Sequence, residues 1–79
     1  MIKTIHSKAY KQLLSWLKAC REEKGLTIRQ LAEQISVHHS IVWNIENAER
    51  RLDVMEYVQY CQQLEVDPMI GIKILNEER

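Results

Sequence analysis

The stretch from Gly25 to Arg51, GLTIRQLAEQISVHHSIVWNIENAERR, decides the fold of this chain. Its apolar residues recur at helical spacing in two short segments, which predicts two amphipathic helices joined by a tight turn. Ala32 is small enough to lie where the helices cross most closely, and Ser36 falls at the turn. The apolar contacts between the two helices are expected from Ile35, Val37, Val42 and Ile45. The pattern indicates a helix-turn-helix motif over about residues 27–48.

A longer helix is expected before this motif, from Ser7 as its N-cap to about Lys24, with Gly25 as its terminator. Trp16 lies at the edge of the apolar stripe of this helix, where we expect it to cover the core boundary, with contact to a partner subunit as the alternative. The stripe itself is interpreted as core and consists of Tyr10, Leu13, Leu14, Leu17 and Cys20.

Within the motif, Thr27 is expected to cap a second helix that ends near Gln34. A third helix is expected to start around His38 or His39 and to continue to about Asn47 or Ala48. Projection of the third helix at about 100° per residue separates an inward from an outward side. The inward side holds Val42, Ile45, Glu46 and Glu49, and the outward side holds His39, Ser40, Trp43, Asn44 and Asn47. A carboxylate on the inward side needs a cationic partner, because an unpaired buried charge is costly. Arg21 is the best candidate partner for Glu46.

Two further helices are expected after a loop that contains Arg50 and Arg51. Asp53 caps the fourth helix, and the pair Asp67-Pro68 starts a fifth over about residues 68–78, because proline is preformed for the first helical position. The inward residues of the fourth helix are predicted to be Val54, Tyr57, Val58, Cys61 and Leu64.

The fifth helix is apolar around most of its circumference, with Gly71 and Lys73 as the main interruptions. One small core cannot cover so many directions, so we predict a two-fold dimer through this helix. The alternative is a frayed, partly exposed terminal helix. The predicted dimer interface consists of Met69, Ile70, Ile72, Ile74 and Leu75.

Length and composition limit the kind of protein that this chain forms. With 79 residues, of which 46% are apolar, residues 1–79 are expected to form a single domain with one small core and no large catalytic cleft. Cys20 and Cys61 fall on apolar helix faces, which favours buried thiols in a reducing cytosol over a disulfide. No apolar run has membrane-spanning length, and Met1 to His6 lacks the features of a signal peptide, so we expect a cytoplasmic protein without a membrane partner.

The formal net charge is zero, but the charges are unevenly distributed along the chain. Residues 1–51 hold nine basic and five acidic residues, a net charge of +4, whereas residues 52–79 hold two basic and six acidic residues, a net charge of −4. The helix-turn-helix motif lies in the basic half. This division suits a domain that meets phosphate with one face and solvent or another subunit with the opposite face.

Four short pieces of the sequence recur together: REEKGLT before the second helix, LAEQ with its small alanine, IEN at the end of the third helix, and the closing LEVDP. With these pieces, the chain from about Leu13 to Leu75 resembles the Cro and phage-repressor (XRE-like) type of helix-turn-helix regulator, which has five helices and binds DNA. The resemblance implies a lambda-repressor-like, all-α fold, with the motif formed by the second and third helices. It also implies that Arg21 and Glu46 form an ion pair between the first and third helices.

The resemblance implies positions for the DNA contacts as well. His38 would cap the recognition helix, His39 and Ser40 would meet base edges, and Trp43, Asn44 and Asn47 would lie further along the groove or at its phosphate wall. The chain departs from the family pattern at Ser36 and Glu65, where glycine is frequent. Ile28 replaces the glutamine that commonly contacts a phosphate, so that contact is missing or is made by Thr27 and Arg29.

We therefore expect a homodimeric regulator, in the first instance a repressor, that reads an inverted repeat in double-stranded DNA with half-sites about 34 Å apart. The expected base-reading residues are His39, Ser40, Trp43 and Asn44. The expected phosphate contacts, made together with backbone amides at helix N-termini, are Thr27, Arg29, His38, Asn47, Arg50 and Arg51.

Several alternatives remain open at this stage. Arg50 and Arg51 could be a solvated pair that contacts Glu49 or Asp53. His38 and His39 do not indicate a metal site, because adjacent helical side chains diverge and no third ligand lies at a suitable spacing. With a reference pKa of about 6.5, they could instead make DNA affinity rise as the pH falls.

The main functional alternative is a module for protein–protein interaction, such as an antitoxin or co-regulator, in which Trp43 anchors a toxin or another regulator. Enzymatic activity is not expected, because the chain has no nucleophile with a nearby base, no phosphate-binding glycine loop and no clustered carboxylates. No cofactor is expected.

Overall fold

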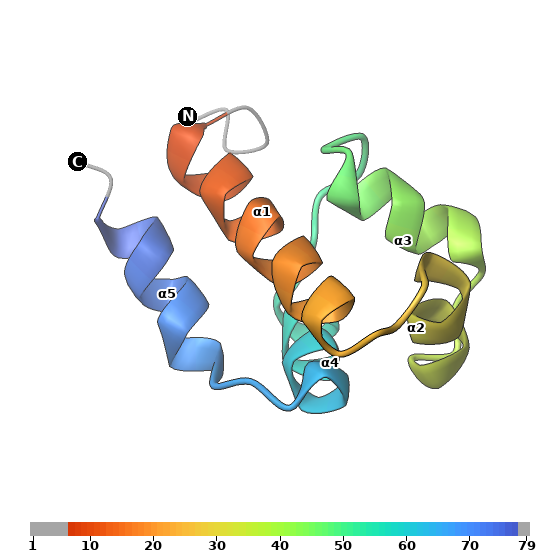
Figure 1. The fold of residues 1–79 in the computed structure, drawn as a ribbon. Coiled ribbons are helices and arrows are strands. Elements are labelled where there is room, and N and C mark those ends of the chain that lie inside the picture. Colours follow the sequence, from red (N-terminus) through yellow and green to blue (C-terminus); the bar gives the residue numbers. More distant parts are fainter. Residues whose placement is uncertain (1–6, 78–79) are drawn as a thin grey trace.

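Helices make up the regular structure of residues 7–77, the part of the chain that this computed structural model describes (Figure 1). In chain order they are α1 (Lys8–Glu23), α2 (Ile28–Gln34), α3 (His39–Glu46), α4 (Val54–Leu64) and α5 (Pro68–Asn76). In Figure 1, α1 runs through the middle of the molecule, α2 and α3 lie on one side of it, and α5 lies antiparallel to it on the other. The predicted five-helix, all-α fold is confirmed, while the expectation for Met1 to His6 concerns residues outside the described range.

Each helix begins at a polar residue whose side chain accepts a hydrogen bond from a backbone N–H of the first turn. The N-caps are Ser7, Thr27, His38, Asp53 and Asp67, as the sequence predicts. At Thr27 and Asp53 the side chain three residues further on also accepts a hydrogen bond from the cap, which completes a capping box. Because these bonds satisfy otherwise unpaired donors, the start of each helix is determined locally.

Three non-glycine residues among those described adopt the left-handed conformation at the ends of helices. Ser36 has a φ of 60° after α2, Ala48 a φ of 59° after α3, and Glu65 a φ of 57° after α4. The departures from glycine at Ser36 and Glu65 are thus accommodated without a change of fold. A left-handed residue with a Cβ costs roughly 1–2 kcal/mol, so these turns are strained. The strain at Ala48 was not anticipated from the sequence.

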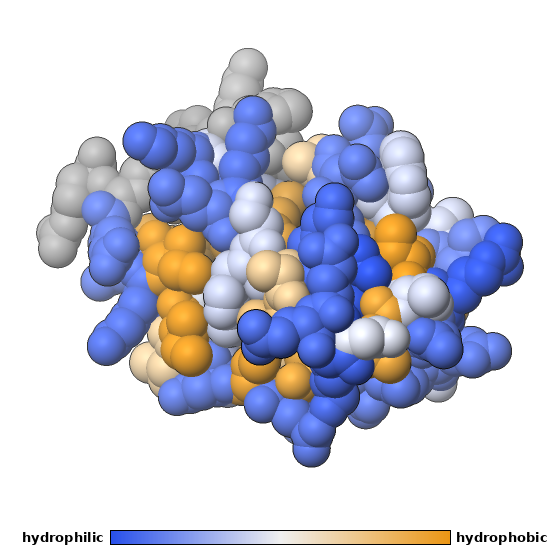
Figure 2. Space-filling view, viewed as in Figure 1, coloured by the Kyte–Doolittle hydropathy of each residue, from blue (hydrophilic) through white to orange (hydrophobic). Residues whose placement is uncertain are grey.

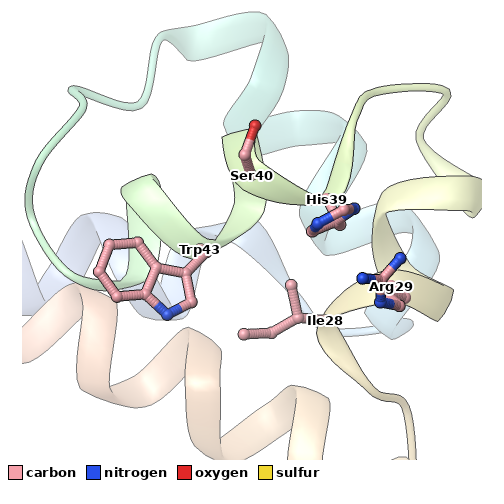
Figure 3. A pocket seen from close by; sticks show the side chains of 5 residues that line it. All are labelled: Ile28, Arg29, His39, Ser40 and Trp43. Atoms are coloured by element: carbon pink, nitrogen blue, oxygen red, sulfur yellow. The ribbon is translucent and has the colours of Figure 1, made fainter.

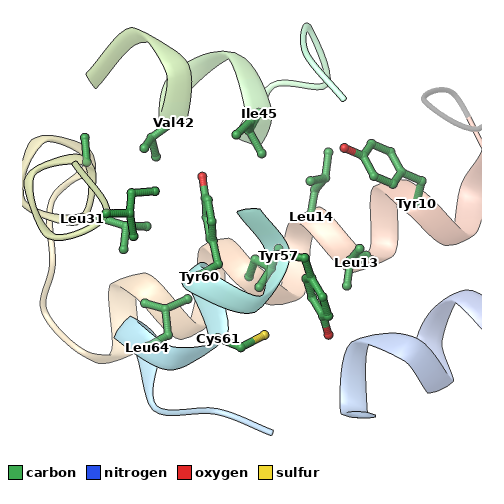
Figure 4. Packing of buried hydrophobic residues seen from close by; sticks show 13 residues of the cluster. Tyr10, Leu13, Leu14, Leu31, Val42, Ile45, Tyr57, Tyr60, Cys61 and Leu64 are labelled. Carbon is green, nitrogen blue, oxygen red and sulfur yellow. The ribbon is translucent and has the colours of Figure 1, made fainter. Parts of the chain in front are cut away.

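The core lies between α1 and the layer formed by α2, α3 and α4 (Figure 4). Tyr60 of α4 is at its centre, with the ring between Leu31 of α2 and the apolar residues of α1, and with the hydroxyl pointing toward α3. This hydroxyl has no hydrogen-bond partner among the described residues, and burial raises the pKa of Tyr60. The buried apolar residues are Ala9, Tyr10, Leu13, Leu14, Leu17, Leu31, Ala32, Ile35, Val42, Ile45, Tyr57, Tyr60, Cys61 and Leu64.

Two residues predicted to point inward are exposed instead. Val54 is 76% exposed, because it is the first residue of α4 and lies past the edge of the core. Glu49 is exposed because α3 ends at Glu46 and the chain reverses at Ala48, so the helical projection no longer applies there. Val58 is only half-buried.

The two cysteines are free thiols, as the sequence predicts. Cys61 is buried in the core and Cys20 is half-buried against it. Burial raises the pKa of both thiols, which keeps them protonated and poorly nucleophilic at neutral pH. Trp16 is also half-buried and packs against the core, in line with the packing interpretation.

A buried ion pair ties α3 to α1. The Arg21 Nε and Nη2 donate to the two carboxylate oxygens of Glu46 at 2.7 and 3.1 Å. The Arg21 Nη1 also donates to the backbone carbonyl of Leu26 at 2.8 Å. The two side chains are only 9% and 5% exposed, so the contact is bidentate and largely removed from water. It holds the end of α3 at a defined place on the end of α1.

α5 is held on α1 and α4 by a close approach of its backbone at Gly71. A Cβ at this position would lie 2.2 Å from the Tyr57 hydroxyl oxygen and 2.7 Å from a methyl carbon of Leu13. The Tyr57 hydroxyl also donates to the backbone carbonyl of Pro68. Gly71 therefore marks the line along which α5 meets the core.

The sides of α5 that turn away from this line are apolar. Figure 2 shows a band of hydrophobic residues over α5. Ile74 is half-buried and packs against the core, so it is less available to a partner than the predicted dimer interface assumes. The exposed apolar residues are Met69, Ile70, Ile72 and Leu75. No helix within residues 7–77 is long and apolar enough to cross a membrane.

Candidate nucleic-acid interface

The outward side of α3 is open to solvent, and neither α4 nor α5 covers it in the part of the chain that is described. Ser40 and Asn47 are exposed, and Trp43 is 50% exposed. His39 and Asn44 are half-buried at the edges of this side. The outward side therefore carries the residues that the sequence assigned to it, in a position where a large ligand can reach them.

His38 orients the first turn of α3. Its Nδ1 accepts a hydrogen bond from the backbone N–H of Ser40 at 3.2 Å, so Nδ1 carries a lone pair and the ring proton of the neutral form is on Nε2. The Ser40 Oγ lies 2.8 Å from the same Nδ1. An acceptor at Nδ1 requires the Ser40 hydroxyl to act as the donor in this contact. The Nε2–H of His38 and the lone pairs of Ser40 Oγ are left for a ligand.

His39 lies next to the ring of His38 and the side chain of Arg29 (Figure 3). Its ring centroid is 4.2 Å from that of His38, and Figure 3 shows its side chain next to that of Arg29. Desolvation, followed by the positive charge of Arg29, lowers the pKa of His39 below its ordinary value of 6.5. His39 is therefore mainly neutral at pH 7 in the free protein.

A shallow hollow lies where the start of α2 meets the outward side of α3. We call it the α2–α3 hollow; its volume is about 390 Å³ and it is lined by Ile28, Arg29, His39, Ser40 and Trp43. In Figure 3 the indole of Trp43 and the side chain of Ile28 face each other across it, with Arg29 and His39 at the opposite end. The hollow thus brings together three of the four predicted base-reading residues, one predicted phosphate contact and Ile28.

Thr27 and Arg29 are both exposed at the start of α2. Thr27 Oγ1 accepts a hydrogen bond from the Gln30 N–H at 3.1 Å, so its own hydroxyl proton remains available for donation. At the C-terminal end of α3, the Asn47 Nδ2 donates to the Trp43 carbonyl at 2.8 Å, and one amide proton of Asn47 remains available. The side chains of Thr27, Arg29 and Asn47 can therefore still donate to phosphate oxygens.

Arg50 has a partner other than those considered from the sequence. Its guanidinium donates to both carboxylate oxygens of Glu56, at 2.9 and 2.8 Å, rather than to Glu49 or Asp53. Hydrogen bonding from Arg50 lowers the pKa of the Glu56 carboxyl. Since Glu56 Oε1 also accepts the Asp53 N–H at 3.1 Å, Arg50 braces the loop against the start of α4.

Arg51 is exposed but does not lie with the residues of the α2–α3 hollow. It lines a different groove, between α1, the start of α4 and α5, where Tyr10, Ile72 and Leu75 are among its neighbours. The structure therefore separates Arg51 from Arg29, although the sequence treated both as phosphate contacts of one surface.

Lysines on α1 extend the positive surface beyond the residues predicted from the sequence. Lys11 and Lys18, two exposed residues of α1, line a shallow depression together with Asn47 and Ala48 at the end of α3. Their seven-residue spacing places both on one side of α1, a signal that the sequence contains. The contact with the end of α3 depends on how the two helices pack, so the sequence alone does not reveal it.

The described residues also bear on metal binding. Within residues 7–77, no three His, Cys, Asp or Glu side chains come together in an arrangement that could hold a metal ion.

Comparisons with known proteins agree with this geometry. The helix-turn-helix domain family matches residues 12–69. The structure is also similar to a solved structure of an XRE-family like protein from Pseudomonas syringae pv. tomato str. DC3000, with 39% sequence identity and a TM-score of 0.82, over 94% of this chain and 90% of that chain. Among curated proteins, none matches the chain significantly.

The fold and the exposed α3 define a helix-turn-helix protein. With more than half of its residues matched, the chain belongs to the helix-turn-helix domain family, of the XRE-like, Cro and phage-repressor type. This membership places it in the general class of DNA-binding regulators and confirms the resemblance inferred from its sequence.

Proposed function

We propose that this protein is a sequence-specific transcriptional repressor that binds double-stranded DNA as a homodimer, with α3 in the major groove. The observation that carries the proposal is the open outward side of α3, which is capped by His38 and tied to α1 through Arg21 and Glu46. A recognition helix needs such a free and firmly held surface to reach base edges. Its proposed place of action is the cytoplasm.

The proposed contacts fall into two groups. Base edges are read by His39, Ser40, Trp43 and Asn44, in order of increasing distance from the start of α3. Phosphates are contacted by Thr27, Arg29, His38 and Asn47, to which we add Lys11 and Lys18 beside the end of α3. Charged contacts of this kind supply affinity that depends on salt, whereas the base contacts supply specificity.

Arg50 and Arg51 have smaller roles in this proposal than the sequence alone assigned to them. Arg50 is bound to Glu56, so its main role is to hold the loop after α3. Arg51 is a peripheral phosphate contact in this proposal, because it is exposed but lies in the groove beside α5. We therefore expect removal of Arg29 to weaken DNA binding more than removal of Arg51.

Dimerisation is proposed through α5. Met69 is 57% exposed, Ile70 45%, Ile72 43% and Leu75 37%, which is a large apolar surface for a helix of nine residues. A two-fold related copy of α5 would remove these side chains from water. Two copies of α3 could then meet successive turns of the groove, so the target would be an inverted repeat.

The test is selection of bound sites from random double-stranded DNA with the full-length protein. A two-fold symmetric consensus, with half-sites about 34 Å apart, would support both the target class and the dimer. Arg29→Ala should weaken binding to all sequences and reduce the salt slope by about 1, whereas Ser40→Ala should relax preference at one position. Lys24→Ala removes a surface charge that is paired with Glu65 and does not line the α2–α3 hollow, and it serves as the matched control.

Lack of DNA binding even at low salt, by protein shown to be folded, would contradict the proposal. That result would favour the alternative of a module that binds a toxin or co-regulator. The observation in favour of this alternative is Trp43, which is half exposed on a surface that is otherwise mostly polar.

A further inference from the structure

The α2–α3 hollow has walls that are unusual for a surface facing a polyanion. Ile28 and Trp43 form its apolar part, while Arg29, His39 and Ser40 stand at its edge (Figure 3). No acidic side chain lines it. The hollow is therefore apolar inside and neutral or positive at the rim, which suits a small apolar group carried by an anionic ligand.

The position of the hollow identifies which part of a duplex could enter it. Trp43 is four residues after His39 and three after Ser40, so it lies one helical turn further along the same side of α3. If α3 lies in the major groove, base edges face the hollow, and the backbone passes near Arg29. Among the groups that base pairs present in the major groove, the C5 methyl of thymine is the apolar one.

We propose that Ile28 and Trp43 hold the C5 methyl group of one thymine in each half-site. This inference rests on the proposed function and specifies what the hollow recognises. The hollow thus gives this chain an apolar contact for a base at the start of α2.

The proposal explains why the two apolar residues remain accessible. Ile28 is half-buried against the core, and Trp43 is 50% exposed. Contact with a methyl group removes part of this surface from water without requiring a hydrogen bond. Removal of one methyl group from such a contact typically changes affinity about fourfold.

The experiment uses the full-length protein and the strongest DNA site obtained by selection. Each thymine is replaced in turn by deoxyuridine, which lacks only the C5 methyl group, and the dissociation constant is measured by fluorescence anisotropy. At one position per half-site we expect about fourfold weaker binding, and about fifteenfold when both half-sites are changed. Uracil at other positions should have little effect.

Variants locate the methyl contact on the protein. In Ile28→Gln and Trp43→Ala, the ratio of the dissociation constants for uracil and thymine should fall to near one at this position. Val54→Ala removes apolar surface from an exposed residue of α4 and should leave the ratio unchanged. Circular dichroism establishes that each variant is folded before its binding is measured.

The outcomes separate this inference from the proposed function. Binding that is insensitive to uracil at every position would overturn the methyl contact while leaving the DNA-binding function intact. A uracil effect that persists in both Ile28→Gln and Trp43→Ala would also overturn it, because the methyl group would be read elsewhere. If the folded protein binds no DNA, both the inference and the proposed function fail.

Discussion

α3 and α5 both present an outward side to solvent, but the chain holds the two helices in different ways. α3 packs into the core through Val42 and Ile45, and directional polar contacts fix its orientation further, namely the bidentate pair between Arg21 and Glu46 and the cap formed by His38. α5 is positioned mainly by steric fit, with Gly71 pressed against Tyr57 and Leu13. The outward side of α3 is mostly polar, and that of α5 is mostly apolar.

The difference fits the two proposed partners, which are DNA for α3 and a second copy of the chain for α5. Hydrogen bonds to base edges depend on distance and angle, so the helix that makes them has to be held in one orientation. Apolar contact between two copies of a helix is less directional and tolerates small shifts. Changes at the supports of the two helices should therefore have different consequences, which the following predictions measure.

The largest effect is expected from Glu46→Ala. Loss of this carboxylate leaves the buried Arg21 guanidinium without its partner, which should lower the free energy of unfolding by about 3–5 kcal/mol. Urea denaturation followed by circular dichroism measures the change. Glu49→Ala, at an exposed position just after α3, is the control and should change stability by no more than about 0.5 kcal/mol. Similar midpoints for the two variants would mean that the ion pair does not hold α3.

A smaller loss of stability is expected from Gly71→Ala, at the support of α5. The added methyl would lie 2.2 Å from the Tyr57 hydroxyl oxygen, so α5 has to shift, at a cost of about 1–3 kcal/mol. Tyr57→Phe removes that oxygen and should recover part of the loss when combined with Gly71→Ala. Additive effects of the two substitutions in urea denaturation would argue against this contact.

Ile72→Glu tests the outward side of α5 without disturbing its support. A charge in the proposed apolar interface should weaken self-association at least about tenfold, with little change in monomer stability, because the side chain is 43% exposed. Analytical ultracentrifugation over a concentration series measures this. Met55→Glu, at a 67% exposed residue of α4, is the matched control. Equal self-association of both variants would place the interface elsewhere.

Ala48→Gly should stabilise the protein. Ala48 has a φ of 59° at the end of α3, and glycine adopts this conformation without steric cost. We expect a gain of about 1 kcal/mol, which corresponds to a rise in Tm of roughly 4–8 °C for a domain of this size. Differential scanning calorimetry provides the measurement. A lower Tm would show that the methyl group of Ala48 contributes more through packing than the conformation costs.

The smallest effect is expected from pH. The pKa of His39 is lowered in the free protein by desolvation and by the charge of Arg29. The phosphates of DNA favour the charged form, so binding takes up a proton and affinity should rise as the pH falls from neutral, by at most about tenfold per pH unit. The free energy of unfolding of the free protein should fall as the pH falls, because the pKa of His39 is lower in the folded chain than in the unfolded chain.

Anisotropy titrations between pH 5.5 and 8 distinguish the two histidines. His39→Asn should abolish the rise in affinity at acid pH. His38→Asn retains a side chain that can cap α3 and should preserve the rise. An unchanged pH profile in His39→Asn would assign the proton uptake to another group.

Local features of the fold could be predicted from the sequence, and features that depend on packing between helices could not. The caps at Ser7, Thr27, Asp53 and Asp67 involve residues two or three positions apart, so their patterns are visible in the sequence. The pairing of Arg50 with Glu56 required the path of the loop between α3 and α4, and was missed.

The candidate site shows the same limit. His39, Ser40 and Trp43 were assigned to the outward side of α3 because helical periodicity determines it. The role of Ile28 depends on the angle between α2 and α3, which brings it opposite Trp43 and which no local pattern encodes. Val54 was misplaced because periodicity says nothing about where the core ends.

The hydrogen bond between Ser40 and His38 restricts which bases this protein can prefer. While its proton is directed at the ring nitrogen of His38, the Ser40 oxygen can only accept hydrogen bonds from a ligand. Adenine and cytosine offer amino groups in the major groove, at N6 and N4, whereas O6 of guanine and O4 of thymine are acceptors. If Ser40 reads a base edge as proposed, the bound site should carry adenine or cytosine opposite Ser40.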